Sequence, residues 1–168
     1  LSSILPKNFS IDLLKVKTPP IRTEVLGQFT LDEVMPFVRK TSERIEFKVG
    51  DQSYFVKMNS SRYFVFQKSH VCIACGLEGK VFLLEKHPHS NPPHFNLYGE
   101  EKGNLVLMTK DHIVPRAKNG SEKLENFVTC CHICNNLKAD YDLTYDQVSE
   151  VRKVFDANQE ASRKARSK

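Results

Sequence analysis

The sequence predicts an α+β fold, in which several short strands precede a long closing helix. Residues 44–48 and 53–57 alternate apolar and polar side chains around a polar turn, a pattern typical of a β-hairpin. Three further short apolar runs also predict strands: 80–85, 95–98 and 104–109, the last two joined by a turn over 99–103 that begins at Gly99. Residues 144 to about 165 carry apolar side chains at helical spacing, which predicts a long amphipathic helix.

The first part of the chain carries weaker signals. Residues 1 to about 28 contain a Pro-Pro pair and scattered apolar residues, which favours an extended arm or short strands. A helix is expected to begin at Thr30, because Thr30 can cap it and Glu33 stands three residues later, as in a capping box. Residues 62–68 fit a short helix or a strand, and periodicity does not separate the two.

Charge and hydropathy narrow the classes of partner. The chain has a formal net charge of +5 and a pI near 8.9, which suits a polyanionic partner such as nucleic acid. No run approaches the roughly 18 apolar residues that a membrane-spanning helix requires. We therefore expect nucleic acid rather than a membrane as the partner.

The five cysteines are more informative than the charge. Their odd number argues against a framework made of disulfides alone. Four of them form two C-x-x-C pairs, Cys72 with Cys75 and Cys131 with Cys134, a spacing typical of metal-binding knuckles. Four thiolates complete the tetrahedral shell of Zn²⁺ and leave no position for water. The sequence therefore predicts a structural zinc site, and reduced thiols suit a cytoplasmic compartment.

The second knuckle allows more than one set of ligands. Cys130 paired with Cys134, or His132 in place of one thiolate, would also supply zinc ligands. Cys131 is preferred because it repeats the spacing of the first pair. Cys130 is then expected to point away from the metal as a buried free thiol.

A second group of polar residues lies between the knuckles. Asp111 and His112 are adjacent after a strand-like run, which must end or bend there if both are to face one site. Asp111 offers a hard oxygen for Mg²⁺ or Mn²⁺, and His112 can act as a general base at neutral pH. Asn135 offers a neutral carbonyl oxygen at the start of a predicted helix. A metal held in this way can stabilise the leaving oxygen of a phosphodiester while His112 activates water.

The stretch from about residue 68 to 140 resembles the HNH nuclease family. The features occur in the family's order: a C-x-x-C pair, the run DHIVP at 111–115, a central Asn, the run C-x-x-C-N at 131–135, and a trailing Lys. The resemblance implies a ββα-metal core and cleavage of nucleic acid that depends on a divalent metal. The resemblance is to the zinc-knuckled branch of the family, which is found among phage and bacterial endonucleases.

The resemblance also implies a role for each matching residue. His112 would be the general base, and Asp111 would be one ligand of the catalytic metal. Asn126 would be the central asparagine, which in the family braces the loop and orients the base. Asn135 would be the second metal ligand in a motif of HNN type, since many relatives have His there. Three basic residues near the motif are expected to contact phosphate: Arg116, Lys118 and Lys138.

We therefore expect three parts: an N-terminal α+β region for recognition or docking (1–67), a zinc-bound HNH nuclease domain (68–142), and a C-terminal helix with a basic tail (143–168). The expected function is an endonuclease with structural Zn²⁺ and catalytic Mg²⁺ or Mn²⁺. Its expected partner is double-stranded DNA, with a homodimer as one route to cutting both strands, in the cytoplasm of a bacterial or phage-infected cell. The alternative is a non-catalytic zinc-knuckle module that binds nucleic acid or protein.

Overall fold

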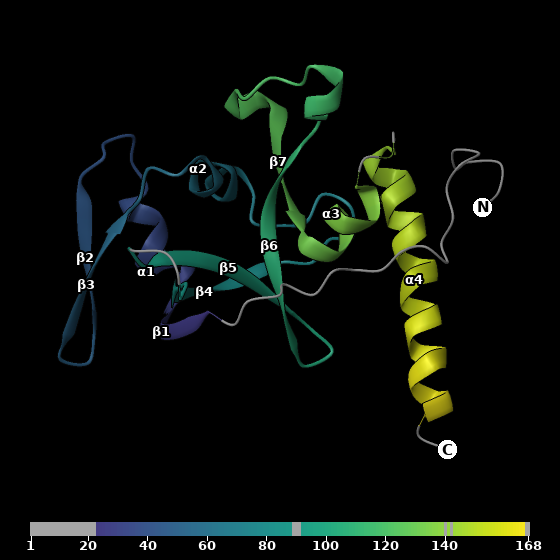
Figure 1. Cartoon of the computed structure of the whole chain (residues 1–168), viewed down its shortest axis with the longest axis horizontal. Coiled ribbons are helices and arrows are strands. Elements are labelled where there is room, and N and C mark those ends of the chain that lie inside the picture. Colours follow the sequence, from purple (N-terminus) through teal and green to yellow (C-terminus); the bar gives the residue numbers. More distant parts are fainter. Residues whose placement is uncertain (1–22, 89–91, 140, 142, 167–168) are drawn as a thin grey trace.

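The computed structural model describes residues 23–88, 92–139, 141 and 143–166. It confirms the α+β class, with an antiparallel five-stranded sheet in the order β1-β4-β5-β6-β7 and a separate β2-β3 hairpin. The strands are β1 (Glu24–Thr30), β2 (Arg44–Val49), β3 (Gln52–Lys57), β4 (Gly79–Lys86), β5 (His94–Glu101), β6 (Asn104–His112) and β7 (Phe127–Cys131). The helices are α1 (Leu31–Val34), α2 (Ser61–Lys68), α3 (His132–Lys138), α4 (Tyr145–Arg166) and the 3₁₀ turns η2 (Met35–Phe37), η3 (Arg116–Lys118) and η4 (Leu124–Asn126). The hairpin and α4 lie at opposite ends of the molecule (Figure 1).

The helices of the first half follow their local signals. The Thr30 hydroxyl accepts a hydrogen bond from the Glu33 backbone, and the Glu33 carboxylate accepts one from the Thr30 backbone, so the predicted capping box is present. The helix ends after one turn and continues as η2, which contains Pro36. Residues 62–68, which fitted a helix or a strand, form most of α2. The predicted arm lies largely outside the described residues, and its end forms β1.

One predicted turn is shorter than expected. The sequence placed Gly99 in a turn over 99–103, but Gly99 lies inside β5, and only Lys102 and Gly103 connect β5 to β6. Both have positive φ angles, 52° and 74°, as in the tight turns that suit hairpins. Gly99 is needed for packing instead, because a Cβ atom there would lie 2.5 Å from the Glu78 carbonyl oxygen. A glycine that permits close approach was therefore mistaken for a turn residue.

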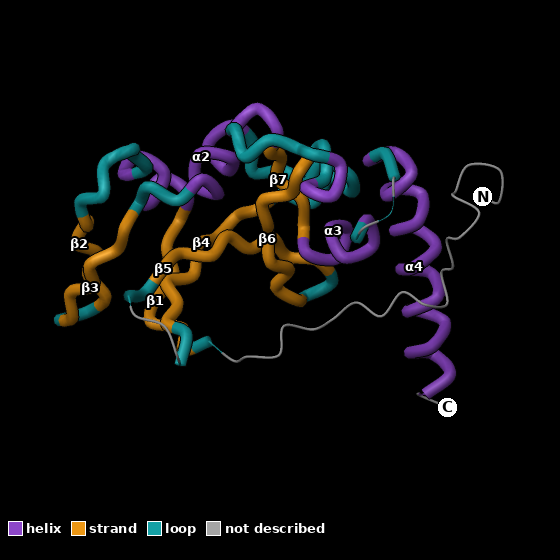
Figure 2. Tube along the Cα trace, turned by 45° about the horizontal axis from the view of Figure 1, so that its top comes forward, coloured by secondary structure: helices purple, strands orange, loops and turns teal. Residues whose placement is uncertain are grey.

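The core is built around aromatic side chains. Phe95 of β5 is fully buried, and its ring meets Phe47 of the β2-β3 hairpin with centroids 4.7 Å apart and planes at 78°. Phe29 of β1 and Phe82 of β4 make similar edge contacts with Phe95. The predicted hairpin thereby packs beside the sheet (Figure 2), against the same aromatic cluster that Phe66 of α2 joins through Phe82.

β6 pairs with a different strand in each half. Residues 104–107 pair with β5, and residues 108–112 pair with β7. α3 follows β7 directly and contacts both β6 and β7. The three elements form the ββα unit that the resemblance implies, and β6 ends at Asp111 and His112. The shared strand fixes this unit to the hydrophobic core.

None of the helices in the described ranges is both long and apolar enough to cross a membrane.

The packing makes a prediction about two phenylalanines. Replacing the buried Phe95 with Ala should lower the free energy of unfolding by about 3–5 kcal/mol, because it removes a ring and leaves a cavity. Phe55→Ala is the control, since Phe55 is 52% exposed and should change stability by less than about 0.5 kcal/mol. Urea unfolding of the two variants measures both values, and similar midpoints would contradict this account of the core.

Candidate metal centre and active site

The first cysteine pair lies on a tight knuckle between α2 and β4. The Cys72 backbone N–H donates to the Leu77 carbonyl at 2.8 Å, and the Gly76 N–H donates to the Cys72 carbonyl at 3.0 Å. Gly76 has a φ angle of 75°, which glycine adopts at little cost. The turn brings both thiols of the C-x-x-C pair to one side of the loop.

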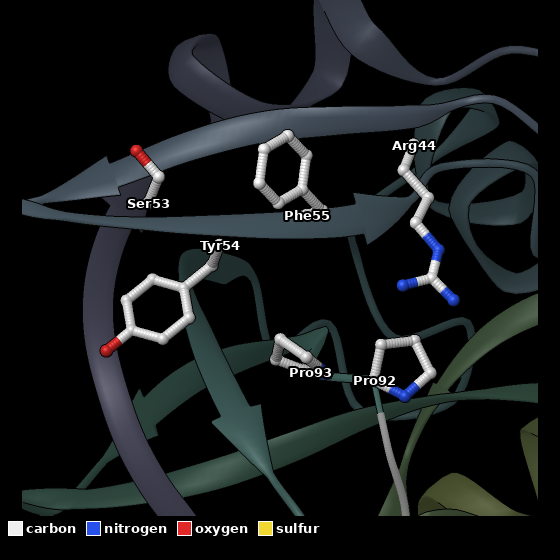
Figure 3. A pocket seen from close by; sticks show the side chains of 6 residues that line it. All are labelled: Arg44, Ser53, Tyr54, Phe55, Pro92 and Pro93. Atoms are coloured by element: carbon white, nitrogen blue, oxygen red, sulfur yellow. The ribbon is translucent and has the colours of Figure 1, made fainter.

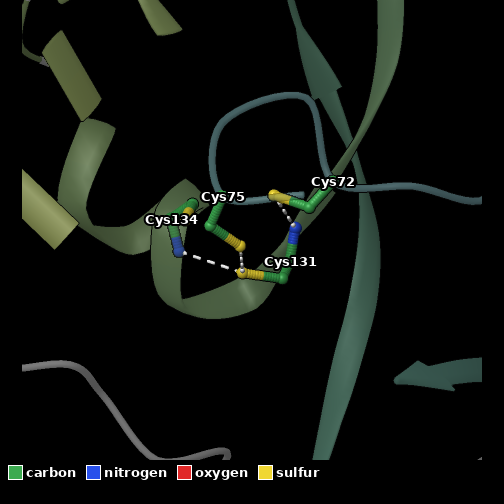
Figure 4. A group of neighbouring side chains, drawn as sticks. All are labelled: Cys72, Cys75, Cys131 and Cys134. Atoms are coloured by element: carbon green, nitrogen blue, oxygen red, sulfur yellow. Dashed lines mark hydrogen bonds between the residues drawn. The ribbon is translucent and has the colours of Figure 1, made fainter. Parts of the chain in front are cut away.

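The second pair lies where β7 passes into α3. Cys131 is the last residue of β7 and the N-cap of α3, and its sulfur accepts the Cys134 N–H at 3.4 Å. The Cys131 N–H in turn donates to the Cys72 sulfur at 3.2 Å, which joins the two knuckles (Figure 4). A thiolate at this helix N-terminus also meets the favourable end of the helix dipole.

The four sulfurs of Cys72, Cys75, Cys131 and Cys134 all lie within 4.8 Å of one another, and three of the four residues are buried. Tetrahedral ligands about 2.3 Å from a zinc ion would lie roughly 3.8 Å apart. The Cys75 and Cys131 sulfurs are 3.8 Å apart. The cluster therefore fits zinc in both donor type and spacing, and the backbone donors suit charged sulfurs.

Cys130 does not point away as expected. Its side chain is fully buried, and its sulfur lies 3.9 Å from the Cys72 sulfur, at the border of the cluster. Among the described residues, the group whose ligand atoms converge contains Cys131 but neither Cys130 nor His132.

A buried arginine of α4 completes the surroundings of the cluster. Arg152 is 2% exposed, and its Nη1 lies 3.5 Å from the Cys131 sulfur and 3.7 Å from the Cys134 sulfur. Its other nitrogens pair with Glu101 and Asp156. A zinc ion with four thiolates carries a charge of about −2, which a guanidinium at this position offsets. Arg152 was not identified from the sequence. The one signal that could have pointed to it is its position four residues after Val148, beside the apolar stripe of the helix.

The loop between β6 and β7 is closed by Asn126. Its side-chain oxygen accepts the Val114 N–H at 2.9 Å, and its amide nitrogen donates to the carbonyls of Val114 and Ser121 at 3.0 and 2.8 Å. The loop folds so tightly that a Cβ atom on Gly120 would lie 1.8 Å from the Val114 carbonyl oxygen. Asn126 thus holds the chain that follows His112 in one conformation.

Asp111 is 8% exposed and is held by three donors. Its Oδ1 accepts the His112 N–H at 2.8 Å, and its Oδ2 accepts the Lys138 ammonium and the Tyr145 hydroxyl, each at 2.8 Å. A carboxylate has about four acceptor positions, so one on Oδ1 remains for a further partner. Burial, and then the negative charge of Asp111, raise the pKa of Tyr145, so this hydroxyl keeps its proton and donates.

Lys138 was expected to contact phosphate, but its side chain is buried. It is 4% exposed, and its ammonium also donates to the His112 carbonyl at 2.7 Å. The ammonium therefore acts on the two residues at the end of β6, and Lys138 is also among the residues that line the pocket there. Tyr145, from the first turn of α4, was not identified from the sequence, because it stands 34 residues from Asp111.

His112 lies at the edge of the same site. Its ring packs edge-on against Phe127, with centroids 4.6 Å apart, and its Nε2 lies 3.0 Å from Glu122 Oε1. Glu122 also accepts a hydrogen bond from Arg116 at 2.7 Å. The hydrogen bond from Arg116, and then that from His112, lower the pKa of Glu122, so its carboxylate is charged. A charged carboxylate favours a proton on Nε2, and in that tautomer the Nδ1 atom carries the lone pair of the neutral ring. Glu122 belongs to none of the sequence motifs, so it was not identified from the sequence.

Asn135 lies on the side of α3 that faces β6. Its amide nitrogen donates to the Thr109 hydroxyl at 3.1 Å. Thr109 and Asp111 stand two residues apart on one face of β6, a spacing of about 7 Å. The structure therefore brings Asn135 to the face that carries Asp111, with its amide hydrogen-bonded to Thr109.

A pocket of about 210 Å³ opens at the end of β6. Its lining includes Asp111, His112, Arg116, Lys118 and Lys138. Arg116 is largely exposed, with 71% of its side chain accessible. The pocket thus combines a candidate base, a carboxylate and exposed cations, a combination that suits the hydrolysis of a phosphate ester.

Comparison with known families agrees with this geometry. The model of the family described as HNH endonuclease matches residues 99–140, which confirms the resemblance for that segment. The segment runs from the end of β5 to the end of α3 and contains Asp111, His112, Asn126 and Asn135. No curated protein and no solved structure matches the chain. The first cysteine pair and α4 lie outside the matched segment.

The zinc assignment leads to a prediction about adjacent cysteines. Cys131→Ser should lose bound zinc and the near-UV circular dichroism of the fold, because three thiolates leave the shell open and the metal supports folding. Cys130→Ser should keep one zinc per chain. Mass spectrometry of the bound metal distinguishes the two variants, and release of zinc to a coloured chelator gives a second measure. If Cys130→Ser lost zinc and Cys131→Ser kept it, the alternative pair of ligands would be correct.

Proposed function

We propose that the protein is a metal-dependent endonuclease that hydrolyses phosphodiester bonds in DNA. The observation that carries this proposal is the pocket at the end of β6, where Asp111 and His112 meet Arg116 and Lys118 inside the segment matched by the HNH endonuclease family. The basic character of the chain, with a net charge of +5, supports a polyanionic substrate.

In this proposal each residue has one task. His112 removes a proton from the attacking water, and Glu122 holds the imidazole through Nε2. Lys138 and Tyr145 fix the Asp111 carboxylate, and Arg116 and Lys118 bind the phosphate. Asn126 keeps the intervening loop in place. The tight packing around these groups supports a preorganised site.

The residues fit a divalent metal at Asp111 better than at Asn135. Asp111 keeps one acceptor position and is among the residues that line the pocket, whereas Asn135 is not; the Asn135 amide nitrogen donates to Thr109, which leaves its side-chain oxygen as an acceptor. Mg²⁺ commonly binds through one or two protein oxygens and takes its other ligands from water and phosphate. A Mg²⁺ or Mn²⁺ ion bound there would stabilise the charge that develops on the leaving oxygen. Asn135 is proposed as the second ligand, and the four cysteines as ligands of a structural zinc.

The wider setting is proposed on the same basis. The substrate is double-stranded DNA, and cutting both strands takes either a homodimer or two separate events, because one HNH site cuts one strand. The three parts of the chain are divisions of function: recognition in 1–67, cleavage in 68–142 and support from 143–168. We place the protein in the cytoplasm of a bacterial or phage-infected cell.

The first test concerns His112. His112→Ala should lower the rate of plasmid nicking by at least about 100-fold, because the general base is lost. Nicking by the unaltered protein should require Mg²⁺ or Mn²⁺. His70→Ala is the matched control, since His70 is a partly exposed histidine that pairs with Glu78 outside the pocket, and it should cut normally. If none of these proteins cuts DNA while each carries zinc, the proposal is wrong and the zinc-knuckle binding module takes its place.

The second test concerns Glu122. Glu122→Gln should lower kcat by about tenfold and leave KM nearly unchanged, because the glutamine orients His112 without the charge. Glu125→Gln, an exposed acid three residues later, should leave both constants unchanged. Steady-state cleavage of a labelled duplex measures the two constants. An increase in KM alone would show that Glu122 affects substrate binding and not the base.

A further inference from the structure

The β2-β3 hairpin presents an exposed face that no part of the proposed site uses. Phe47 and Val56 of the hairpin are buried, at 6% and 0% exposure, and face the core. Because neighbours on a strand point to opposite faces, the alternate residues face away from the core. These residues, here called the ribbon face, are all exposed: Arg44, Glu46, Lys48, Ser53, Phe55 and Lys57.

The charge on the ribbon face is mainly positive. Three cations stand against one acid, Glu46, whose carboxylate accepts a hydrogen bond from Ser53. Arg44 and Lys57 are directly opposite each other across the two strands. Two like charges in this position repel each other, and a polyanion bound above both would relieve the repulsion. The arrangement is therefore complementary to closely spaced phosphates.

A large apolar side chain lies among these charges. Phe55 is 52% exposed and stands opposite Glu46 in the strand register. Beside it is a pocket of about 410 Å³ lined by Arg44, Ser53, Tyr54, Phe55, Pro92 and Pro93 (Figure 3). Flat rings next to a guanidinium pack well against sugars and bases.

The ribbon is connected to the cleavage site through one helix. β3 ends at Lys57, and α2 begins four residues later at Ser61. The Ser61 hydroxyl lies 3.1 Å from the ammonium of Lys110, the residue that precedes Asp111. A duplex held by the ribbon would therefore be bound by an element that is tied to the catalytic strand.

We infer that the β2-β3 ribbon is a second DNA-binding element, which contacts phosphates through Arg44, Lys48 and Lys57 and packs Phe55 against the bases of a duplex. A two-stranded ribbon fits a DNA groove, and apolar wedges between base steps are a known mode of contact. The inference rests on the proposed function in taking DNA as the substrate. It adds where, apart from the pocket, the duplex is held.

Binding and cleavage are measured separately to test it. The probe is a labelled DNA duplex of about three helical turns, and its fluorescence anisotropy is followed with Ca²⁺ in place of Mg²⁺. The variants are Phe55→Ala and the triple change Arg44→Ala, Lys48→Ala and Lys57→Ala. The control is Lys153→Ala, which removes an exposed cation from α4.

The triple variant should weaken binding about tenfold or more. The slope of log K against log salt concentration should become less steep by about 1 for each phosphate that the protein no longer neutralises. Phe55→Ala should weaken binding about tenfold with an unchanged salt dependence, because stacking is uncharged. Lys153→Ala should bind as the unaltered protein does. Urea unfolding confirms that the variants fold.

The outcomes separate the two proposals. If the ribbon variants lose binding but no protein cuts DNA, the ribbon inference stands and the nuclease proposal fails. If the unaltered protein cuts DNA and the ribbon variants bind and cut equally well, the ribbon inference is wrong. It is also wrong if the unaltered protein does not bind the duplex, or if the variants change only its oligomeric state, which would make the face a contact between copies of the chain.

Discussion

The four cysteine sulfurs join parts of the chain that are far apart in sequence. Cys75 and Cys131 are separated by 56 residues, yet their sulfurs are 3.8 Å apart at the N-terminus of α3. A zinc ion shared by these thiolates would set the position of α3 against β6, because Cys131 caps that helix. It would thereby also set the distance from Lys138, on the same helix, to Asp111. Four thiolates at such close range would repel each other, and a bound metal would remove that repulsion and stabilise the geometry of the pocket.

β6 connects the pocket to the hydrophobic core. Its first half pairs with β5, which packs on the aromatic cluster, and its second half ends at Asp111 and His112. The charged groups there are buried in pairs: Asp111 with Lys138, and Arg152 with Glu101 and Asp156. A buried ion pair is costly to break, since removing one partner leaves the other uncompensated. These pairs therefore specify one arrangement of strands and helices around the site.

The sequence predicted the features that depend on local pattern. The hairpin, the capping box, the closing helix and the C-x-x-C pairs each follow from residues a few positions apart. The roles of Glu122, Tyr145 and Arg152 were not predictable in this way, because each depends on a contact made only after folding. Gly99 was misread for the same reason, since its small size serves the distant Glu78 backbone. The catalytic roles inferred from the resemblance to the HNH family stay predictions until activity is measured.

The closing helix sets the limits of the functional unit. Tyr145 reaches Asp111 and Arg152 reaches the sulfurs, and the two residues are seven apart, or about two helical turns on one side of α4. One short stretch of helix thus touches both the carboxylate and the thiolate cluster. Residues 99–140, transplanted alone into another scaffold, would leave Asp111 without its tyrosine and the thiolates without their guanidinium. A portable version of this module has to begin before Cys72 and run through Asp156.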